Sequence, residues 1–459
     1  MESVTPGAPA EPAPERSAGP SLMDNPVRRY DWGSRHALSR LQGRLPDGDP
    51  EAELWMGAHP LAPSGLVDPD GRPVALADAI TADPVWVLGP DVLVRFGERL
   101  PFLLKVLAIG RALSIQVHPD PVRAARGFAE DEAAGLSRTD PRRRYADPYP
   151  KPEQLVAMTH VWALAGLRET DRAGLLLDLL DVPELAGVRQ AMQLPGRVAG
   201  TVAAIAALCE YPAGQRRSFV TAVRSAVRQA LAGGRVERDP QLLDAMLWVL
   251  RLADQHPADP MVLAPLLLDL HLLEPGETIY LPAGVPHAYL SGVAVEIMCA
   301  SDNVVRAGLT TKRVDVDALL EMIDPAGKPL LDVPQQRLSD HETVWRPPAA
   351  EFQLSRILVG DGSPRPDAAV PASPLLSGPQ VLLCLTGEIE VRTPGRSVSL
   401  RGGQSAFIPA ASPAPLLLGR GELYRAAVGA RADVPSMVRL EVTLAERRTG
   451  QRADVTAGH

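Results

Sequence analysis

The chain has 459 residues, a net charge of −8 and a pI near 5.7. This length suffices for two to four domains at ~100–200 residues each. The acidic balance, without any basic run or basic–aromatic interleaving, argues against nucleic acid as a partner. The three cysteines, Cys209, Cys299 and Cys384, are odd in number and far apart, so we expect no disulfide framework and a cytoplasmic location. No apolar run approaches the length of a membrane span, so we expect no membrane partner.

The first part of the chain combines a polar tail with a β-rich segment. Residues 1–20 are mostly Pro, Ala, Glu, Gly and Ser, with almost nothing to bury, and this composition predicts a disordered tail. In residues 21–168, short apolar segments alternate with turns of Pro, Gly and Asp. This alternation predicts a β-rich domain with a few short helices.

The pattern changes at about Glu169. Apolar residues recur at helical spacing in four runs, which are residues 175–180, 202–209, 219–231 and 242–252. We therefore expect a helical insertion over residues 169–265, whose apolar stripes form its own packed core.

The β pattern returns at Leu266. Residues 277–281 are predicted to form a strand, and a tight Pro/Gly loop then brings in His287. Ser291-Gly292 is predicted to turn the chain back into the next strand. Residues 311–345 are predicted to be helical and then irregular, and the rest of the chain is again short strands and turns.

One segment of the chain is echoed in a second. Residues 276–283 (GETIYLPA) and 403–410 (GQSAFIPA) match position by position in chemical type, and both follow strand-like runs. A duplicated antiparallel module has this signature. Because no histidine follows the second copy, we infer two similar barrels of which only the first keeps metal ligands. A chance match in a short, common turn pattern is the alternative.

A polar stripe lies on the strand predicted just before Pro119. Leu113, Ile115 and Val117 alternate with Ser114, Gln116 and His118, so one face is aliphatic and the other carries a hydroxyl, an amide and an imidazole. A solvated strand face explains this stretch as well as a cavity wall does. Three segments that lie far away in the sequence favour the interpretation of this stretch as a cavity wall.

Those segments complete a set of metal ligands and add charged groups. Lys151 and Glu153 are two residues apart with Pro152 between them, and His287 follows the Pro/Gly loop. Two imidazoles, one carboxylate and one amide oxygen form a four-ligand set for Zn²⁺, although two His and a carboxylate suit Fe²⁺ equally. The third segment supplies the acids and cations Glu296, Asp302, Arg306 and Lys312.

The sequence has no phosphate-binding glycine loop. Neither the P-loop pattern nor the dinucleotide-binding pattern is present. If a phosphorylated ligand binds, Arg and Lys side chains must hold it directly, together with a hydroxyl such as that of Ser114.

These motifs resemble those of type I mannose-6-phosphate isomerases. They follow one another in the family's order between about residues 26 and 320: RYDWGS at 29–34, AELWMGAHP at 52–60, QVHPD at 116–120, KPE at 151–153, LPAGVPHAY at 281–289 and SDNVVRAGLT at 301–310. The resemblance implies a mainly β fold with a helical insertion. Residues 21–168 and 266–335 would form a cupin (jelly-roll) catalytic domain, interrupted by the insertion. Residues 336–459 would form a second cupin-like domain without metal ligands.

The resemblance also implies an activity. It predicts a monomeric zinc-dependent aldose–ketose isomerase that interconverts mannose 6-phosphate and fructose 6-phosphate through an enediolate and feeds mannose and GDP-mannose metabolism. One Zn²⁺ per chain would be held by Gln116, His118, Glu153 and His287. Arg306 would be a catalytic residue, and Ser114, Lys105 and Lys312 would bind the phosphate.

The identity of the proton-transferring base stays open at this point. Glu296 is the first candidate, and Lys151 and Asp302 compete with it. Trp32 either lines the sugar pocket or belongs to the core. One departure from the family pattern is that Tyr149-Pro150 precedes Lys151 where the family commonly has Asn-His, which leaves no imidazole for ring opening at that position.

Two other functions remain compatible with the sequence. One is a metal-dependent oxygenase built on the same pair of cupin barrels. The other is a non-catalytic sugar-phosphate-binding protein, against which the complete ligand set and Arg306 argue, because a binder does not need an ion with an open coordination position.

Overall fold

The computed structural model describes residues 19–67, 73–138, 140, 142–180, 182–233, 239–312, 314–360, 369–373 and 376–430. Most of the predicted N-terminal tail lies outside these residues. Gly19 and Pro20, which the prediction included in the tail, are buried. A side chain at position 19 would collide with Thr393 and Arg396, so the chain already packs closely against the protein there.

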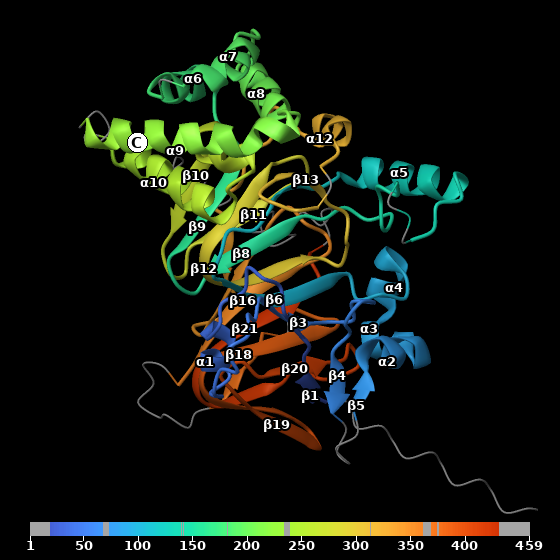
Figure 1. The fold of residues 1–459 in the computed structure, drawn as a ribbon. Helices are drawn as coiled ribbons and strands as arrows, with labels where there is room; N and C mark the ends of the chain where they lie inside the picture. The colour runs from blue at the N-terminus through green and yellow to red at the C-terminus, as the bar shows by residue number, and fades with distance from the viewer. Residues whose placement is uncertain are drawn as a thin grey trace, which may run out of the picture.

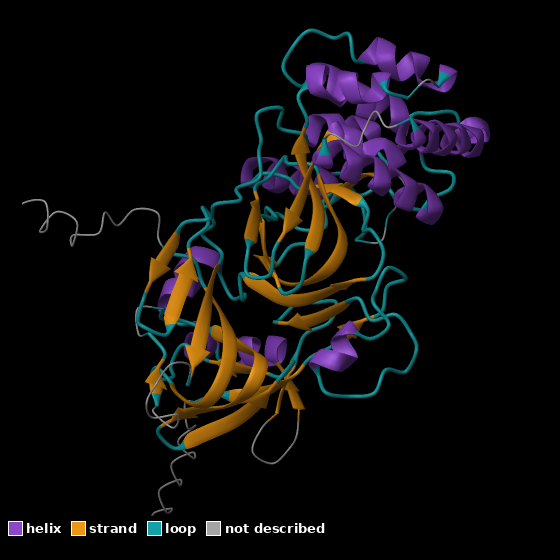
Figure 2. Ribbon diagram, turned by 90° about the vertical axis from the view of Figure 1, so that its left-hand side faces the viewer, coloured by secondary structure: helices purple, strands orange, loops and turns teal. Residues whose placement is uncertain are grey.

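Two antiparallel sheets, a block of helices and six further helices are found in the described part of the chain. The helical block covers one end of the first sheet, and the second sheet lies at the opposite end (Figures 1 and 2). The described residues contain no helix with the length and apolar character needed to cross a membrane.

The first sheet has ten strands in the described residues. Its main order is β10-β9-β12-β6-β3-β2, with β7, β8, β11 and β13 attached to that path. The strands are β2 (Val27–Arg28), β3 (Glu53–Met56), β6 (Phe102–Ile109), β7 (Ile115–Val117), β8 (Glu153–Ala157), β9 (Val161–Leu167), β10 (Leu268–Leu273), β11 (Thr278–Leu281), β12 (His287–Cys299) and β13 (Val305–Gly308).

Strand β12 organises this sheet. It pairs with four of the nine other described strands of this sheet, which are β6, β7, β8 and β9. The predicted turn at Ser291-Gly292 is wrong, because the strand continues through these residues with a β-bulge. Gly292 has φ +118°, and a Cβ there would lie 2.5 Å from the carbonyl oxygen of His160, so glycine fits this irregularity.

The second sheet has eleven strands in the part of the chain that the structure describes. Its main order is β14-β15-β16-β21-β18-β20-β1-β4-β5, with β17 on β21 and β19 on β18. The strands are β1 (Ser21–Asp24), β4 (Gly65–Val67), β5 (Pro73–Ala75), β14 (Gln335–Arg337), β15 (Glu342–Trp345), β16 (Gln353–Val359), β17 (Val370–Pro371), β18 (Gln380–Thr393), β19 (Arg396–Arg401), β20 (Ser405–Ile408) and β21 (Leu416–Ala427).

The N-terminal strand joins this second sheet. The prediction assigned all of residues 21–168 to the catalytic domain, but Ser21 of β1 lies opposite Phe407 of β20, and β4 and β5 extend the sheet from β1. The pairing covers the edge of β20, which would otherwise present unpaired backbone groups. No local pattern of residues encodes such a long-range contact.

The helical block lies between β9 and β10. It contains α6 (Thr170–Asp178), α7 (Ala186–Ala191), α8 (Ala199–Cys209), α9 (Arg216–Ala232), α10 (Pro240–Gln255) and α11 (Ala264–Leu267), with the 3₁₀ turns η1 (Pro183–Leu185), η2 (Ala213–Gln215) and η3 (Pro260–Leu263). Each of the four predicted helical runs overlaps one of α6, α8, α9 and α10. Asp239 begins α10 by accepting a hydrogen bond from the amide of Leu242, with Pro240 in the first turn.

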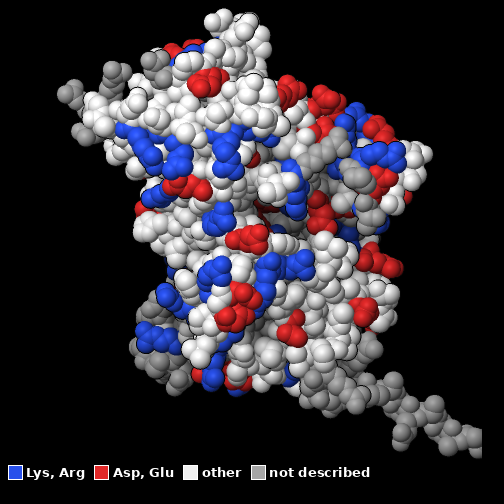
Figure 3. Space-filling view, in the orientation of Figure 1, with Lys and Arg blue, Asp and Glu red and all other residues white. Residues whose placement is uncertain are grey.

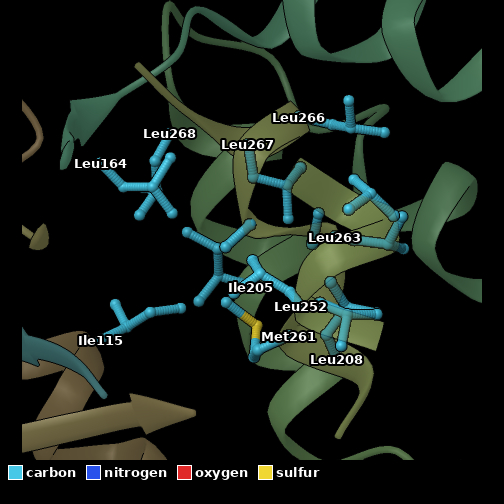
Figure 4. Close-up of a cluster of buried hydrophobic side chains, with 14 of the residues drawn as sticks. Ile115, Leu164, Ile205, Leu208, Leu252, Met261, Leu263, Leu266, Leu267 and Leu268 are labelled. Atoms are coloured by element: carbon cyan, nitrogen blue, oxygen red, sulfur yellow. The ribbon is translucent and has the colours of Figure 1, made fainter. Parts of the chain in front are cut away.

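The helical block shares its core with the first sheet. Ile205 and Leu208 of α8 belong to the same buried cluster as Ile115 of β7 and Leu164 of β9 (Figure 4). Full burial of one such side chain is worth about 1.5–3 kcal/mol. The helices therefore pack against the apolar face of β7, the strand that carries the predicted polar stripe.

The remaining helices are short, apart from one. They are α1 (Ala37–Leu41), α2 (Leu76–Ala82), α3 (Pro84–Leu88), α4 (Pro90–Phe96), α5 (Pro121–Ala133) and α12 (Val316–Met322). The predicted helical and then irregular segment 311–345 contains α12 but also β14 and β15.

Figure 3 shows basic and acidic side chains interspersed over one face, in keeping with the small net charge.

The sequence echo corresponds to a repeated unit of five strands. The two echoed segments contain β11 and β20, and the order β3-β6-β12-β8-β11 of the first sheet is repeated as β15-β16-β21-β18-β20 in the second. The backbone register is also the same. Opposite residues run Trp55, Lys105, Glu296, Leu155, Ile279 across the first unit and Val344, Ser355, Arg425, Leu382, Ala406 across the second.

The second unit is filled by a buried ionic network. Arg425, which occupies the position of Glu296 in this register, has no exposed surface and contacts Glu342 and the side-chain oxygen of Gln380. Ser355 donates a hydrogen bond of 2.7 Å to Glu342, and the amide of Ser373 donates one of 3.0 Å. The buried Glu342 carboxylate therefore receives its hydrogen bonds and its counter-charge from within the network.

We predict that Arg425→Ala destabilises the second sheet strongly. The substitution leaves Glu342 buried without its cation, and truncating one member of a buried pair costs about 3–5 kcal/mol. Urea unfolding followed by tryptophan fluorescence and circular dichroism measures this loss.

The matched control is Arg401→Ala. Arg401 pairs with Glu388 on the surface, where the side chains are 72% and 60% exposed, and exposed pairs contribute little. Replacing both buried partners, as Arg425→Met with Glu342→Leu, should recover much of the stability. Equal unfolding curves for R425A and R401A would contradict the prediction.

Candidate active site

Three of the four predicted metal ligands meet in the interior. His118 follows β7, Glu153 begins β8 and His287 begins β12, and all three side chains are buried. Their ligand atoms all lie within 4.8 Å of one another. His118 Nε2 is 3.2 Å from one Glu153 oxygen and His287 Nε2 is 3.5 Å from the other.

The outer hydrogen bonds of both imidazoles fix which nitrogen faces the cluster. His118 Nδ1 lies 2.8 Å from the carbonyl oxygen of Asn303, and His287 Nδ1 lies 2.9 Å from that of Val285. A carbonyl can only accept, so each Nδ1 carries a proton and each Nε2 presents a lone pair to Glu153.

Three acceptors that face one another need a positive charge between them. Burial lowers the pKa of His118 to about 4, with the charge of Lys151 adding to the effect, so protonation does not supply this charge at neutral pH. His118 Nε2 is buried and lacks a hydrogen-bond partner. A divalent cation with N and O ligands fits these residues.

Gln116, the fourth predicted ligand, borders the cluster. It lies opposite His287 across the β7–β12 pair and opposite Arg306 across the β7–β13 pair. Its side chain lines a small cavity of about 70 Å³ that Glu153 and His287 also line.

A buried chain of charges surrounds the small cavity. Lys151 Nζ lies 3.2 Å from Glu153, and Lys105 Nζ lies 3.2 Å from Glu296 and 3.7 Å from Glu53. Burial opposes the charge of Glu153, but Lys151 and the imidazoles hold its pKa well below the ordinary value. Burial likewise opposes the charge of Lys105, but Glu53 and Glu296 outweigh it and raise its pKa.

Glu296 titrates near neutrality. Burial raises the pKa of this carboxyl to about 7, against the opposing effect of Lys105. A carboxyl with such a pKa can both accept and release a proton at physiological pH. Lys105 and Glu296 come from directly opposite positions of β6 and β12, so the sheet register sets their contact.

A larger cavity of about 570 Å³ adjoins these residues and shares Lys105, Gln116 and Lys151 with the small one. Its volume lies within the range of ~300–1,000 Å³ found for small-molecule sites. The other predicted site residues in its lining are Trp32, Ser114, Asp302, Arg306 and Lys312. Trp32 is partly buried and also packs against the core.

Arg306 and Lys312 make one part of this cavity cationic. The pKa of Lys312 is lowered, first by the charge of Arg306 and then by burial, and burial lowers the pKa of Arg306 as well. Burial and their mutual repulsion therefore destabilise the charged forms of both side chains. An anion bound between them would relieve this destabilisation.

Asp147 ties the loop around Asp302 to the site. Its carboxylate accepts hydrogen bonds from the Ser301 hydroxyl at 2.8 Å, from the Asp302 amide at 2.8 Å and from the Asn303 side chain at 3.3 Å. The same Asn303 supplies the carbonyl that orients His118. One carboxylate thus supports a loop that both orients a residue of the ligand cluster and lines the large cavity.

Several lining residues were not assigned a role from the sequence. Glu53, Trp55 and His59 line the large cavity, and Tyr289 lines the small one. The sequence pattern that could have identified Glu53 and Trp55 as lining residues is their alternation with apolar residues in β3. Tyr149, at the position that departs from the family pattern, is not in either lining, because its ring stacks 3.5 Å beneath the guanidinium of Arg99.

We predict that Asp147→Ala weakens metal binding and activity together. The substitution releases the loop that carries the Asn303 carbonyl and Asp302. Changes to the groups that orient metal ligands typically cost ~10–100-fold in affinity or activity, and we expect about 10-fold here. Zn²⁺ affinity is measured by competition with a chelating dye, with Asp140→Ala as the control, since the Asp140 carboxylate pairs with Arg142, whose side chain is exposed. Unchanged affinity in D147A would contradict the assigned role.

Comparison with known proteins identifies the family. Residues 22–170 match the family described as phosphomannose isomerase type I, catalytic domain. The mannose-6-phosphate isomerase of Escherichia coli (strain K12) is 35% identical over 408 residues, which cover 87% of this chain and 97% of the relative.

Solved structures agree with this match. A phosphomannose isomerase variant from Salmonella typhimurium has a TM-score of 0.78 at 32% identity, and a zinc-bound mannose 6-phosphate isomerase has a TM-score of 0.76 at 32% identity. Each match covers 90% of this chain and 100% of the other. The mainly β cupin fold expected from the sequence is confirmed, and the chain belongs to the type I mannose-6-phosphate isomerase family.

Proposed function

We propose that this chain interconverts mannose 6-phosphate and fructose 6-phosphate with the help of one Zn²⁺. The observation that carries the proposal is the buried convergence of His118, Glu153 and His287 beside a cavity that is cationic at Arg306 and Lys312. Such a site offers a sugar phosphate both a divalent ion and a binding place for its phosphate. The relatives of this chain are named as mannose-6-phosphate isomerases, which agrees with this chemistry.

Zinc suits the available donors. Two imidazole nitrogens, a carboxylate and the amide oxygen of Gln116 would hold it, with a further position open to substrate. When bound, the ion polarises substrate oxygens and neutralises the negative charge of the enediolate.

The charged groups of the large cavity would orient the substrate. Arg306 and Lys312, with the hydroxyl of Ser114, would hold the phosphate, and Trp32 would line the sugar. Lys105 was expected among the phosphate ligands. Its contacts with Glu296 and Glu53 favour a role beside the proton-transferring group instead.

Glu296 is the best-placed base. As a carboxylate it would take the proton from C2 of open-chain mannose 6-phosphate, and as an acid it would return that proton to C1. The proton of the C2 hydroxyl would pass to O1 in the same reaction, which leaves the C2 carbonyl of fructose 6-phosphate. Lys105 would keep the carboxylate charged enough to accept the proton. Lys151 and Asp302 are the competing candidates, but Lys151 is already paired with Glu153.

We further infer a cytoplasmic monomer. The candidate ligands and the cavity lining come from one chain, so the site does not require a partner. All three cysteines are free, which suits a reducing compartment.

A coupled assay tests the function directly. Mannose 6-phosphate should be converted to fructose 6-phosphate, a chelator should abolish turnover, and added Zn²⁺ should restore it. Bound iron with oxygen uptake and no isomerisation would favour the oxygenase instead, and sugar-phosphate binding without turnover would favour the binding protein.

Two substitutions separate the metal site from the substrate site. His287→Ala should lose metal and activity together, because it removes one of three buried ligands. Arg306→Ala should keep the metal and lose turnover, because its side chain lines the substrate cavity. Metal content by atomic absorption, read beside the coupled assay, distinguishes the two. Equal metal loss in both variants would reject the assignment.

We predict that Glu296→Gln lowers kcat by about 10²–10⁴-fold, the usual contribution of a positioned base. Its metal content should stay unchanged, since Glu296 is not in the ligand cluster. In D₂O the unaltered enzyme should place deuterium at C1 of fructose 6-phosphate, which NMR detects, and E296Q should not. Lys151→Met and Asp302→Asn are the matched variants. If either of them abolishes deuterium transfer while E296Q retains it, the base is that residue.

A further inference from the structure

His59 lies in the wall of the large cavity, in the segment that follows β3. Its side chain is buried, with 3% of its surface exposed. It is the one imidazole among the described residues that line this cavity. Nothing in the proposed reaction has yet used it.

The hydrogen bonds of His59 define its tautomer. The backbone amide of Leu61 donates to His59 Nδ1 at 3.3 Å, so Nδ1 is the unprotonated nitrogen. The proton is therefore on Nε2, which lies 3.4 Å from a carboxylate oxygen of Asp302. Trp55 contacts the imidazole at a ring-centroid distance of 4.8 Å and an angle of 71°, which holds the plane of the ring.

Asp302 depends on this contact for its orientation. Its backbone amide is anchored to Asp147 at 2.8 Å, but its side chain is 43% exposed toward the cavity. Among the described residues, the imidazole of His59 is the group that bonds to this carboxylate. Burial raises the pKa of Asp302, but the bond from His59 and the charges of Lys151 and Lys105 outweigh burial and lower it.

We propose that His59 is a positioning residue that donates its Nε2 proton to Asp302 and holds this carboxylate in place to accept hydrogen bonds from the hydroxyl groups of the sugar. The proposal rests on the proposed function, because it deepens the account of the same cavity. His59 acts through Asp302, and a purely structural His59 would serve only to pack against Trp55.

Two substitutions at position 59 separate these roles. His59→Phe keeps an aromatic ring against Trp55 but removes the donor, and His59→Gln keeps a donor but removes the ring. A hydrogen bond to a charged group corresponds to a change of roughly 10- to 100-fold. We expect that loss in kcat/KM for H59F, whereas H59Q should stay within about threefold of the unaltered enzyme, and both should keep their metal.

A double-substitution cycle with Asp302→Asn tests whether the effect passes through Asp302. H59F and D302N should not be additive, so the double variant should be no slower than D302N alone. His160→Phe is the control, because His160 pairs with Glu274 at the surface. Additive losses, or a better-preserved activity in H59F than in H59Q, would overturn the proposal.

A measurement without turnover keeps the proposal separate from the proposed function. In the zinc-loaded chain labelled with ¹⁵N-histidine, the resonance that disappears in H59F should report a proton on Nε2, and D302N should shift it. A proton on Nδ1, or no shift in D302N, would refute the His59–Asp302 pair. If the chain does not isomerise mannose 6-phosphate, the proposed function and the substrate role of the pair fail, while the NMR result still decides the pair itself.

Discussion

The active site depends on three buried acceptor atoms that face one point. His118 and His287 direct unprotonated nitrogens at Glu153, and their other nitrogens are committed to backbone carbonyls. Such an arrangement is unfavourable in a dry interior unless a cation joins it. The fold supplies the geometry through β12, whose first residue is His287 and whose pairing with β7 places Gln116 opposite it.

The two repeated units balance the charge of their buried carboxylates in different ways. In the first, Glu296 and Glu153 lie among Lys105, Lys151 and the imidazoles, and the set of acceptors still calls for an external ion. In the second, the position of Glu296 is taken by Arg425, so the chain carries its own cation into the interior. The same register therefore gives a cavity that can hold an ion in one unit and a core with an internal Arg425–Glu342 ion pair in the other.

Local patterns in the sequence predicted those parts of the structure that local physics determines. The helical runs between residues 175 and 252 and the ligand set around His118 could be read from spacing, motifs and family resemblance. The placement of β1 in the second sheet could not, because strand pairing across nearly 400 positions has no local signature. The bulge at Gly292 resembled a turn because both need the same backbone freedom. The contact of His59 with Asp302 joins segments far apart in the chain and becomes visible only once both line one cavity.

The loop of residues 301–303 connects the metal cluster to the substrate wall. Asn303 orients His118 through its carbonyl, while the neighbouring Asp302 faces the large cavity and is held by His59. Asp147 fixes both residues at once, so the position of the ligand and that of the carboxylate cannot vary independently. A sugar phosphate held at Arg306 would reach the ion only if that spacing is kept within a fraction of an ångström. If Arg306 and Lys312 hold the phosphate as proposed, the hydrogen bonds that anchor this short loop to Asp147 would help to set how the substrate lies between those cations and the ion.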